Sequence, residues 1–154
     1  MDTATRCATI GEQLQARGET LAVAESLTGG QVAAAFAAAP GASEWFAGGA
    51  VTYTRDAKHT VLAVPEGPVV SEAAAQAMAS GAAALFRADH ALALTGSGGP
   101  EPQDGQPPGT VWLAATGPWG AATRRLHLDG EPEEVVAAAR DEAVAWLCDR
   151  IGGG

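Results

Sequence analysis

Two hydroxyl side chains, Ser26 and Thr28, stand in a glycine-containing turn of the chain. The turn follows the apolar residues 21–23, which predict a buried strand, and precedes residues 31–39, which predict a helix. Free backbone N–H groups at the start of a helix attract anions and developing negative charge, and Gly29 leaves room for a close approach. The turn therefore predicts either a site that stabilises negative charge or a plain helix cap followed by tight packing.

The elements that must position this turn follow from the spacing of apolar side chains and from helix caps. Helices are expected at residues 4–17, 31–39, 71–87 and from 132 onward, a shorter one at 55–62, and strands at 21–25, 47–54, 91–94, 109–116 and 122–128. Strands alternate with helices until two strands run together before the last helix. This order predicts an α/β fold: a three-layer α/β/α sandwich with a mixed, largely parallel sheet, in one domain spanning residues 1–154.

A second glycine-rich turn, Thr95-Gly96-Ser97, leaves the strand expected at residues 91–94. Ligands of α/β proteins collect at the carboxyl ends of the parallel strands. Because this turn and the Ser26 turn both leave such strand ends, their coincidence predicts a pocket at that edge of the sheet. The segment 101–108 that comes after the second turn is the most loop-like part of the chain.

The composition disfavours several classes of partner and site. A formal net charge of −9 lacks the basic footprint that nucleic acids and anionic membrane surfaces require. Cys7 and Cys148 have no CxxC spacing, which favours free thiols in a reducing cytoplasm over a disulfide. The sequence shows neither a basic-then-apolar leader nor a long apolar run, so we expect a cytoplasmic protein without a signal peptide or membrane span.

The three histidines, His59, His90 and His127, do not form a metal-binding pattern. They lie far apart in the sequence, and none has a cysteine or carboxylate at a ligand spacing. We therefore expect no metal and no cofactor.

Four segments carry, in order, a resemblance to a known family: AESLTGG from Ala24, PGASEWFAGGAVTYTRDAK from Pro40, VSEAAAQAMASGA from Val70, and LALTGSGGP from Leu92 followed by GTV. From about residue 21 to residue 116 the chain resembles the CinA carboxy-terminal domain family. That family is similar in kind to nicotinamide-nucleotide amidohydrolases, which convert nicotinamide mononucleotide to nicotinic acid mononucleotide and ammonia. Some members are fused to a larger amino-terminal domain, and this chain resembles the stand-alone form.

The resemblance implies a catalytic pair. Ser26 would be the nucleophile, and Lys58 would be the base that takes its proton and returns it to leaving ammonia. A lysine can act as a base only if burial or a neighbouring positive charge lowers its pKa. From spacing alone, Lys58 is a solvated lysine on a short helix. Tyr53 would orient Lys58 or bind the carboxamide, or else pack on the sheet.

The expected substrate-binding residues are Glu25, Thr28, Gly29, Gly48, Thr95, Gly96 and Ser97. The N–H groups of Thr28 and Gly29 are candidate oxyanion donors. The Thr95 turn would hold a ribose or phosphate through backbone N–H groups and hydroxyls. Glu25 would bind in the site or fix the Ser26 turn. Gly48 would serve a close approach of the backbone, a structural role first.

The last helix departs from the family pattern. Family members open it with a Gly-Asp-Arg turn followed by a further arginine, whereas this chain has Gly130-Glu131-Pro132 and then Val136. A charge-assisted contact to phosphate is worth roughly 1.5–3 kcal/mol. Its loss predicts poorer affinity, an altered substrate or no activity, unless a nearby arginine substitutes; the candidates are Arg124, Arg125 and Arg140.

Two functions therefore compete. One is hydrolysis of nicotinamide mononucleotide, with that small nucleotide as the partner. The other is a catalytically inactive nucleotide-binding or interaction module associated with competence or DNA damage, which the missing arginines favour. The four tryptophans and the resemblance also favour a homo-oligomer, although tryptophans are equally common in cores.

Overall fold

The computed structural model describes residues 1–99 and 102–153 of the chain. Its centre is a five-stranded sheet with the strand order β2-β1-β3-β4-β5. The strands are β1 (Leu21–Glu25), β2 (Phe46–Val51), β3 (His90–Gly96), β4 (Thr110–Gly117) and β5 (Gly120–His127). β1 pairs in parallel with β2 and β3, while the β3–β4 and β4–β5 pairs are antiparallel. The sheet is thus mixed, with a parallel half and an antiparallel half.

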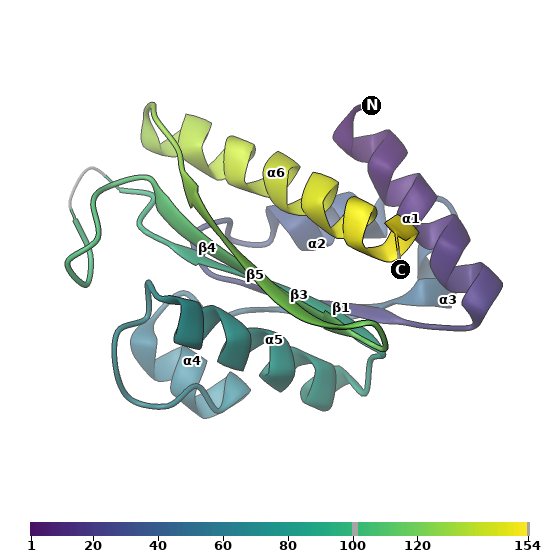
Figure 1. Ribbon diagram of the computed structural model, residues 1–154, viewed down its shortest axis with the longest axis horizontal. Helices are drawn as coiled ribbons and strands as arrows, with labels where there is room; N and C mark the ends of the chain where they lie inside the picture. Colours follow the sequence, from purple (N-terminus) through teal and green to yellow (C-terminus); the bar gives the residue numbers. More distant parts are fainter. Residues whose placement is uncertain (100–101, 154) are drawn as a thin grey trace.

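Helices cover both faces of the sheet (Figure 1). One face carries α1 (Thr3–Arg17), α2 (Gln31–Ala37), α3 (Ala42–Trp45) and α6 (Pro132–Gly153). The other face carries α4 (Arg55–Leu62) and α5 (Glu72–Phe86). This arrangement confirms the predicted three-layer α/β/α sandwich.

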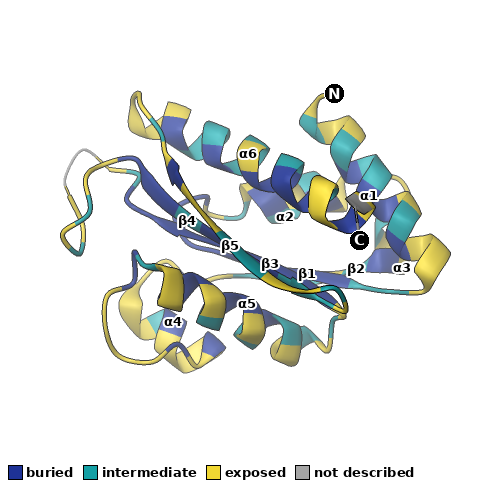
Figure 2. Cartoon of the chain, in the orientation of Figure 1, coloured by how far each residue is buried: buried dark blue, intermediate teal, exposed yellow. Residues whose placement is uncertain are grey.

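The two faces of the sheet pack against different cores. Successive side chains of a strand point to opposite faces, so Leu21 and Val23 of β1 enter one core while Ala22 and Ala24 enter the other. The core under α1 and α6 contains the larger aliphatic and aromatic side chains, and the core under α5 is built mainly from alanine. Figure 2 shows the buried residues following these two interfaces. The small side chains allow α5 to lie close to the strands.

β2 is shorter than the expected strand at residues 47–54, because it ends at Val51. The side chain of Thr54 accepts a hydrogen bond from the Ala57 N–H and caps α4. The chain therefore leaves the sheet early and turns directly into α4. Thr52 and Tyr53 form the short connection, and their carbonyl groups are free to bind a side chain from α4.

Residue Glu101 of the expected loop lies outside the described residues, and residues 102–108 contain a single bridge between Gln103 and Gln106. Cys7 and Cys148 are both free thiols, as predicted. Burial raises the pKa of Cys7 to about 11, so that thiol is inert. Within residues 1–99 and 102–153, no helix has the length and apolar character needed to cross a membrane.

Candidate active site

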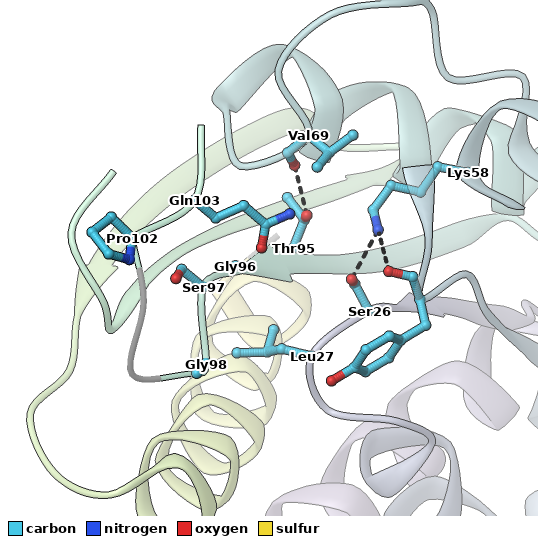
Figure 3. A pocket seen from close by; sticks show the side chains of 12 residues that line it. Ser26, Leu27, Lys58, Val69, Thr95, Gly96, Ser97, Gly98, Pro102 and Gln103 are labelled. Carbon is cyan, nitrogen blue, oxygen red and sulfur yellow. Dashed lines mark hydrogen bonds between the residues drawn. The ribbon is translucent and has the colours of Figure 1, made fainter. Parts of the chain in front are cut away.

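Ser26 and Lys58 meet at the carboxyl edge of the parallel strands. Ser26 directly follows β1, and Lys58 projects from the first half of α4. The Lys58 ammonium donates to Ser26 Oγ at 2.9 Å (Figure 3). Ser26 is buried and Lys58 is only 1% exposed. The two positions are far apart in the sequence, so the β1–β2 register and the early end of β2 bring them together.

Three acceptors surround Nζ of Lys58. Besides Ser26 Oγ, Nζ donates to the Thr52 carbonyl at 2.8 Å and to the Tyr53 carbonyl at 3.3 Å. An ammonium group has three donors, and a neutral amine has two donors and one lone pair. In the neutral form the two carbonyls would keep both N–H groups, and the lone pair would face the Ser26 hydroxyl. This geometry suits proton transfer from Ser26 to Lys58.

Burial lowers the pKa of Lys58 to about 8. The positive charge of Arg55 makes a smaller contribution to this lowered pKa, and the carboxylate of Asp104 acts in the opposite direction. With a pKa near 8, roughly a tenth of Lys58 is neutral at pH 7. The lysine is therefore a buried group with a lowered pKa rather than a solvated cation.

Arg55 and Asp104, which the sequence did not single out, join two loops beside the site. Arg55 donates to Asp104 Oδ1 at 2.9 Å and also to the Gly67 carbonyl. The other carboxylate oxygen of Asp104 accepts from the N–H groups of Val69 and Val70 at 2.9 and 3.1 Å. Asp104 thus fixes the 102–107 loop against the segment before α5. Its partners lie far away in the sequence, so no local sequence pattern predicts these contacts.

A hollow of about 410 Å³, here called the catalytic hollow, opens next to Ser26 and Lys58. Leu27 lines it beside Ser26, and Gln103 lines it from the 102–107 loop. Tyr53 is also part of the lining. The size of the hollow is in the range of small-molecule sites. Tyr53 is 69% exposed and contacts Lys58 through its backbone carbonyl, so its ring lies at the mouth of the hollow.

Thr95, Gly96 and Ser97 all line the catalytic hollow, together with Gly98 and Gly99. The Thr95 hydroxyl donates to the Val69 carbonyl at 2.7 Å, as Figure 3 shows. The Ser97 N–H donates to the Thr110 carbonyl at 3.0 Å, and a Cβ on Gly96 would lie 2.8 Å from that same oxygen. Thr95 and Gly96 therefore belong to β3, which pairs with β4, and the expected turn begins only after Gly96.

Glu25 is fully buried, and its carboxylate points to the start of α2. It accepts from the N–H groups of Gly30, Val32 and Ala33 at 3.2, 3.0 and 2.9 Å. A carboxylate at this position satisfies donors that would otherwise be unpaired and matches the helix dipole. Glu25 therefore fixes the Ser26 turn, and it does not line the catalytic hollow.

Three other expected binding residues lie outside the lining of the catalytic hollow. The Gly29 N–H donates to the Ser26 carbonyl at 3.1 Å, so it closes the turn. Thr28 is buried, and among the described residues its hydroxyl has no hydrogen-bond partner. Gly48 lies in β2 against α5, where a Cβ would be 2.8 Å from the Phe86 ring. Gly48 thus serves packing away from Ser26.

None of the candidate replacement arginines reaches the catalytic hollow. Arg124 lies 4.0 Å from Glu142, and Arg125 stacks over Trp112. Arg140 bonds to Gln31 and to its neighbour Asp141. In the part of the chain that the structure describes, no group of three or more potential metal ligands occurs either.

The chain was compared with protein families and with curated proteins. The model of the CinA C-terminal domain matches residues 3–151. The nicotinamide-nucleotide amidohydrolase PncC of Escherichia coli is 39% identical over 149 residues, covering 92% of this chain and 88% of that protein. A CinA-like protein of Frankia casuarinae is 43% identical over 120 residues, covering 75% of this chain and 28% of the relative. The chain spans only about a third of the length of such longer relatives.

Solved structures show the same fold. The CinA superfamily protein KP700603 of Klebsiella pneumoniae superposes with a TM-score of 0.93 at 37% identity, and each chain is covered completely. A protein of Agrobacterium tumefaciens described as a competence/damage inducible protein superposes with a TM-score of 0.87 at 32% identity, over 96% of this chain and 94% of that one.

Proposed function

Because the chain belongs to the CinA C-terminal domain family, we propose that it is an amidohydrolase that converts nicotinamide mononucleotide to nicotinic acid mononucleotide and ammonia. The relative from Escherichia coli is named for activity on nicotinamide nucleotides, and that name supports the substrate class. The catalytic hollow supports the chemistry, because it combines a serine with a lysine of lowered pKa.

In the proposed first half-reaction, Ser26 Oγ attacks the carboxamide carbon and its proton passes to the neutral Nζ of Lys58. The carbon–nitrogen bond of the resulting tetrahedral species then breaks, and Lys58 returns the proton to the leaving nitrogen, which departs as ammonia. The product of this half-reaction is an ester between Ser26 and the nicotinic acid group. The two carbonyls that bind Nζ keep the lysine directed at Ser26 throughout.

In the second half-reaction, water attacks the ester carbon while Lys58 takes a proton from it. Collapse of this second tetrahedral species returns the proton to Ser26 Oγ and releases the acid. The sum is one amide and one water giving one acid and one ammonia. The donors for the oxyanion would come from the backbone of the Ser26 turn and the 96–99 turn, which line the same hollow.

The observation that carries this proposal is the 2.9 Å contact between Lys58 Nζ and Ser26 Oγ in a buried setting. A lysine kept only for stability would instead extend its charged end to solvent. The buried pair next to an open hollow is the arrangement that a serine nucleophile with a lysine base requires.

The test is ammonia release from nicotinamide mononucleotide by the purified protein. We expect turnover that Ser26→Ala abolishes and that Ser80→Ala, at an exposed serine of α5, leaves unchanged. Nucleotide binding by calorimetry without ammonia release from the unaltered protein would instead favour the catalytically inactive binding module.

A further inference from the structure

A second hollow, of about 340 Å³, adjoins the catalytic hollow. The two share Gly98 and Gly99 in their linings. The second one is bounded by the segment between β5 and α6, and the charged side chains in its lining are Asp129 and Glu131. We call it the acidic hollow. Both of its carboxylate residues are exposed.

Gly98 lies at the junction of the two hollows. A Cβ there would be 3.3 Å from Cδ1 of Leu27, the residue after Ser26, and 3.8 Å from Cγ2 of Val136 in the first turns of α6. Gly98 therefore packs between the residue after Ser26 and the first turns of α6. A substrate with its amide at Ser26 and a tail that extends past Gly98 would enter the acidic hollow.

The start of α6 borders the acidic hollow, and acidic side chains stand in its first turn. The Glu131 N–H donates to Glu134 Oε1 at 3.0 Å, and Glu133 stands in the same first turn. The N-terminus of a helix ordinarily attracts an anion through its free N–H groups and its dipole. Here the carboxylate of Glu134 binds the N–H of the residue before the helix, and a phosphate near the first turn would also meet the negative charges of Asp129 and Glu131.

No basic side chain among the described residues that line the acidic hollow offsets this charge. Among the described residues that line the two hollows, Lys58 is the one cation, and its nitrogen is held by Ser26 and two carbonyls. Arg55 lies outside both linings and is paired with Asp104. A phosphate monoester carries a charge of about −1.5 to −2 at pH 7. Placing it beside Asp129 and Glu131 is a like-charge contact, which acts against binding.

We propose that the acidic hollow selects against a phosphate tail, so that the uncharged nucleoside, nicotinamide riboside, is hydrolysed at least as efficiently as nicotinamide mononucleotide. This inference rests on the proposed amide hydrolysis at Ser26 and adds the class of substrate that the site prefers. The nucleoside keeps the amide and the ribose that the catalytic hollow would hold, and it loses only the group that the acidic hollow repels.

The experiment measures kcat/KM for both compounds with the unaltered protein and with the double variant Asp129→Asn, Glu131→Gln. We expect a nucleotide-to-nucleoside ratio of one or less for the unaltered protein, and an increase of about fivefold in the double variant. Added salt should raise the ratio of the unaltered protein and leave that of the double variant nearly constant, because salt screens exposed charges. Glu142→Gln removes one negative charge later in α6 and should leave the ratio unchanged.

A clear preference of the unaltered protein for the nucleotide, unaltered in the double variant, would overturn the inference while the proposed hydrolysis stands. If neither compound is hydrolysed, the proposed function fails, and calorimetry with both compounds still tests the selectivity. Binding of the nucleoside at least as tightly as the nucleotide supports the inference. Tighter binding of the nucleotide, or binding of neither compound, removes it.

Discussion

The catalytic hollow and the acidic hollow lie at the same edge of the sheet and share two glycines, yet they place charge in opposite ways. In the catalytic hollow, Lys58 is buried and every donor of its ammonium has an acceptor. In the acidic hollow, Asp129 and Glu131 are exposed. Burial of an ionisable side chain shifts its pKa and so changes its protonation state. An exposed charge acts on a ligand only through its electric field, which salt weakens.

The same contrast separates the two helix starts beside these hollows. The carboxylate of Glu25 at α2 is fully buried and accepts three N–H groups, whereas Glu134 at α6 is exposed and accepts one. When a buried N–H group loses its acceptor, water cannot take the acceptor's place. When an exposed N–H group loses its acceptor, water can. We therefore expect Glu25, beside the catalytic hollow, to contribute more to the free energy of unfolding than Glu134, beside the acidic hollow.

The largest expected effect is that of Lys58→Met. The substitution keeps most of the buried volume and removes the base, so we expect kcat to fall by about 10²–10⁴-fold. The measurement is the rate of ammonia release at saturating substrate, with circular dichroism to establish that the variant is folded. A folded variant with activity close to that of the unaltered protein would exclude Lys58 as the base.

Next in size is the difference between the two helix caps. Glu25→Gln keeps one acceptor oxygen and replaces the other by an NH₂ group, which then faces a backbone N–H at the start of α2. We expect the substitution to lower the free energy of unfolding by about 1–3 kcal/mol. Glu134→Gln, the matched change at an exposed cap, should cost about 0.5 kcal/mol. Urea denaturation measures both. Equal losses would show that burial does not distinguish the two caps.

A smaller effect concerns pH. Activity should rise through an acid limb near the Lys58 pKa of about 8, because only the neutral amine accepts the Ser26 proton. Arg55→Gln removes a positive charge that disfavours the ammonium, so it should raise that pKa and move the limb to higher pH. The pH dependence of kcat/KM tests this, with Arg87→Gln at the far end of α5 as the control. A limb displaced to lower pH would contradict the assignment.

The smallest effect is expected on the acidic hollow itself. The double variant Asp129→Asn, Glu131→Gln should change the free energy of unfolding by no more than about 0.5 kcal/mol, since both side chains are exposed. Thermal denaturation monitored by circular dichroism measures the change. A large loss of stability would mean that these carboxylates hold the fold, and the contrast between the two hollows would disappear.

The order of the strands and the longer helices was predictable because each of these elements carries its own periodic pattern and cap signals. The four-residue helix α3 was not among the expected elements. The end of β2 was not predictable, because the apolar and β-branched residues continue to Thr54, whose side chain caps α4 instead. That early end is what exposes the two carbonyls to Lys58. The family resemblance, now confirmed over residues 3–151, pointed to Ser26 and Lys58, whereas spacing alone favoured a solvated lysine.

Other parts of the site depend on contacts between distant segments. Arg55 and Asp104 stand in a short helix and a loop, and nothing near either residue predicts that they pair. Glu25 was expected either in the pocket or as a support of the Ser26 turn, and only its buried hydrogen bonds distinguish the two roles. Sequence patterns report local structure well, but pairings of this kind follow from the packed tertiary arrangement.

Lys58 is the only lysine of the chain. Because Lys58 is almost wholly enclosed, an acylating reagent can reach Nζ only when the surrounding residues move apart. Its rate of acylation, followed by mass spectrometry, would therefore report how often these residues expose Nζ to the catalytic hollow. The same rate would show whether a ligand bound in the hollow covers Nζ.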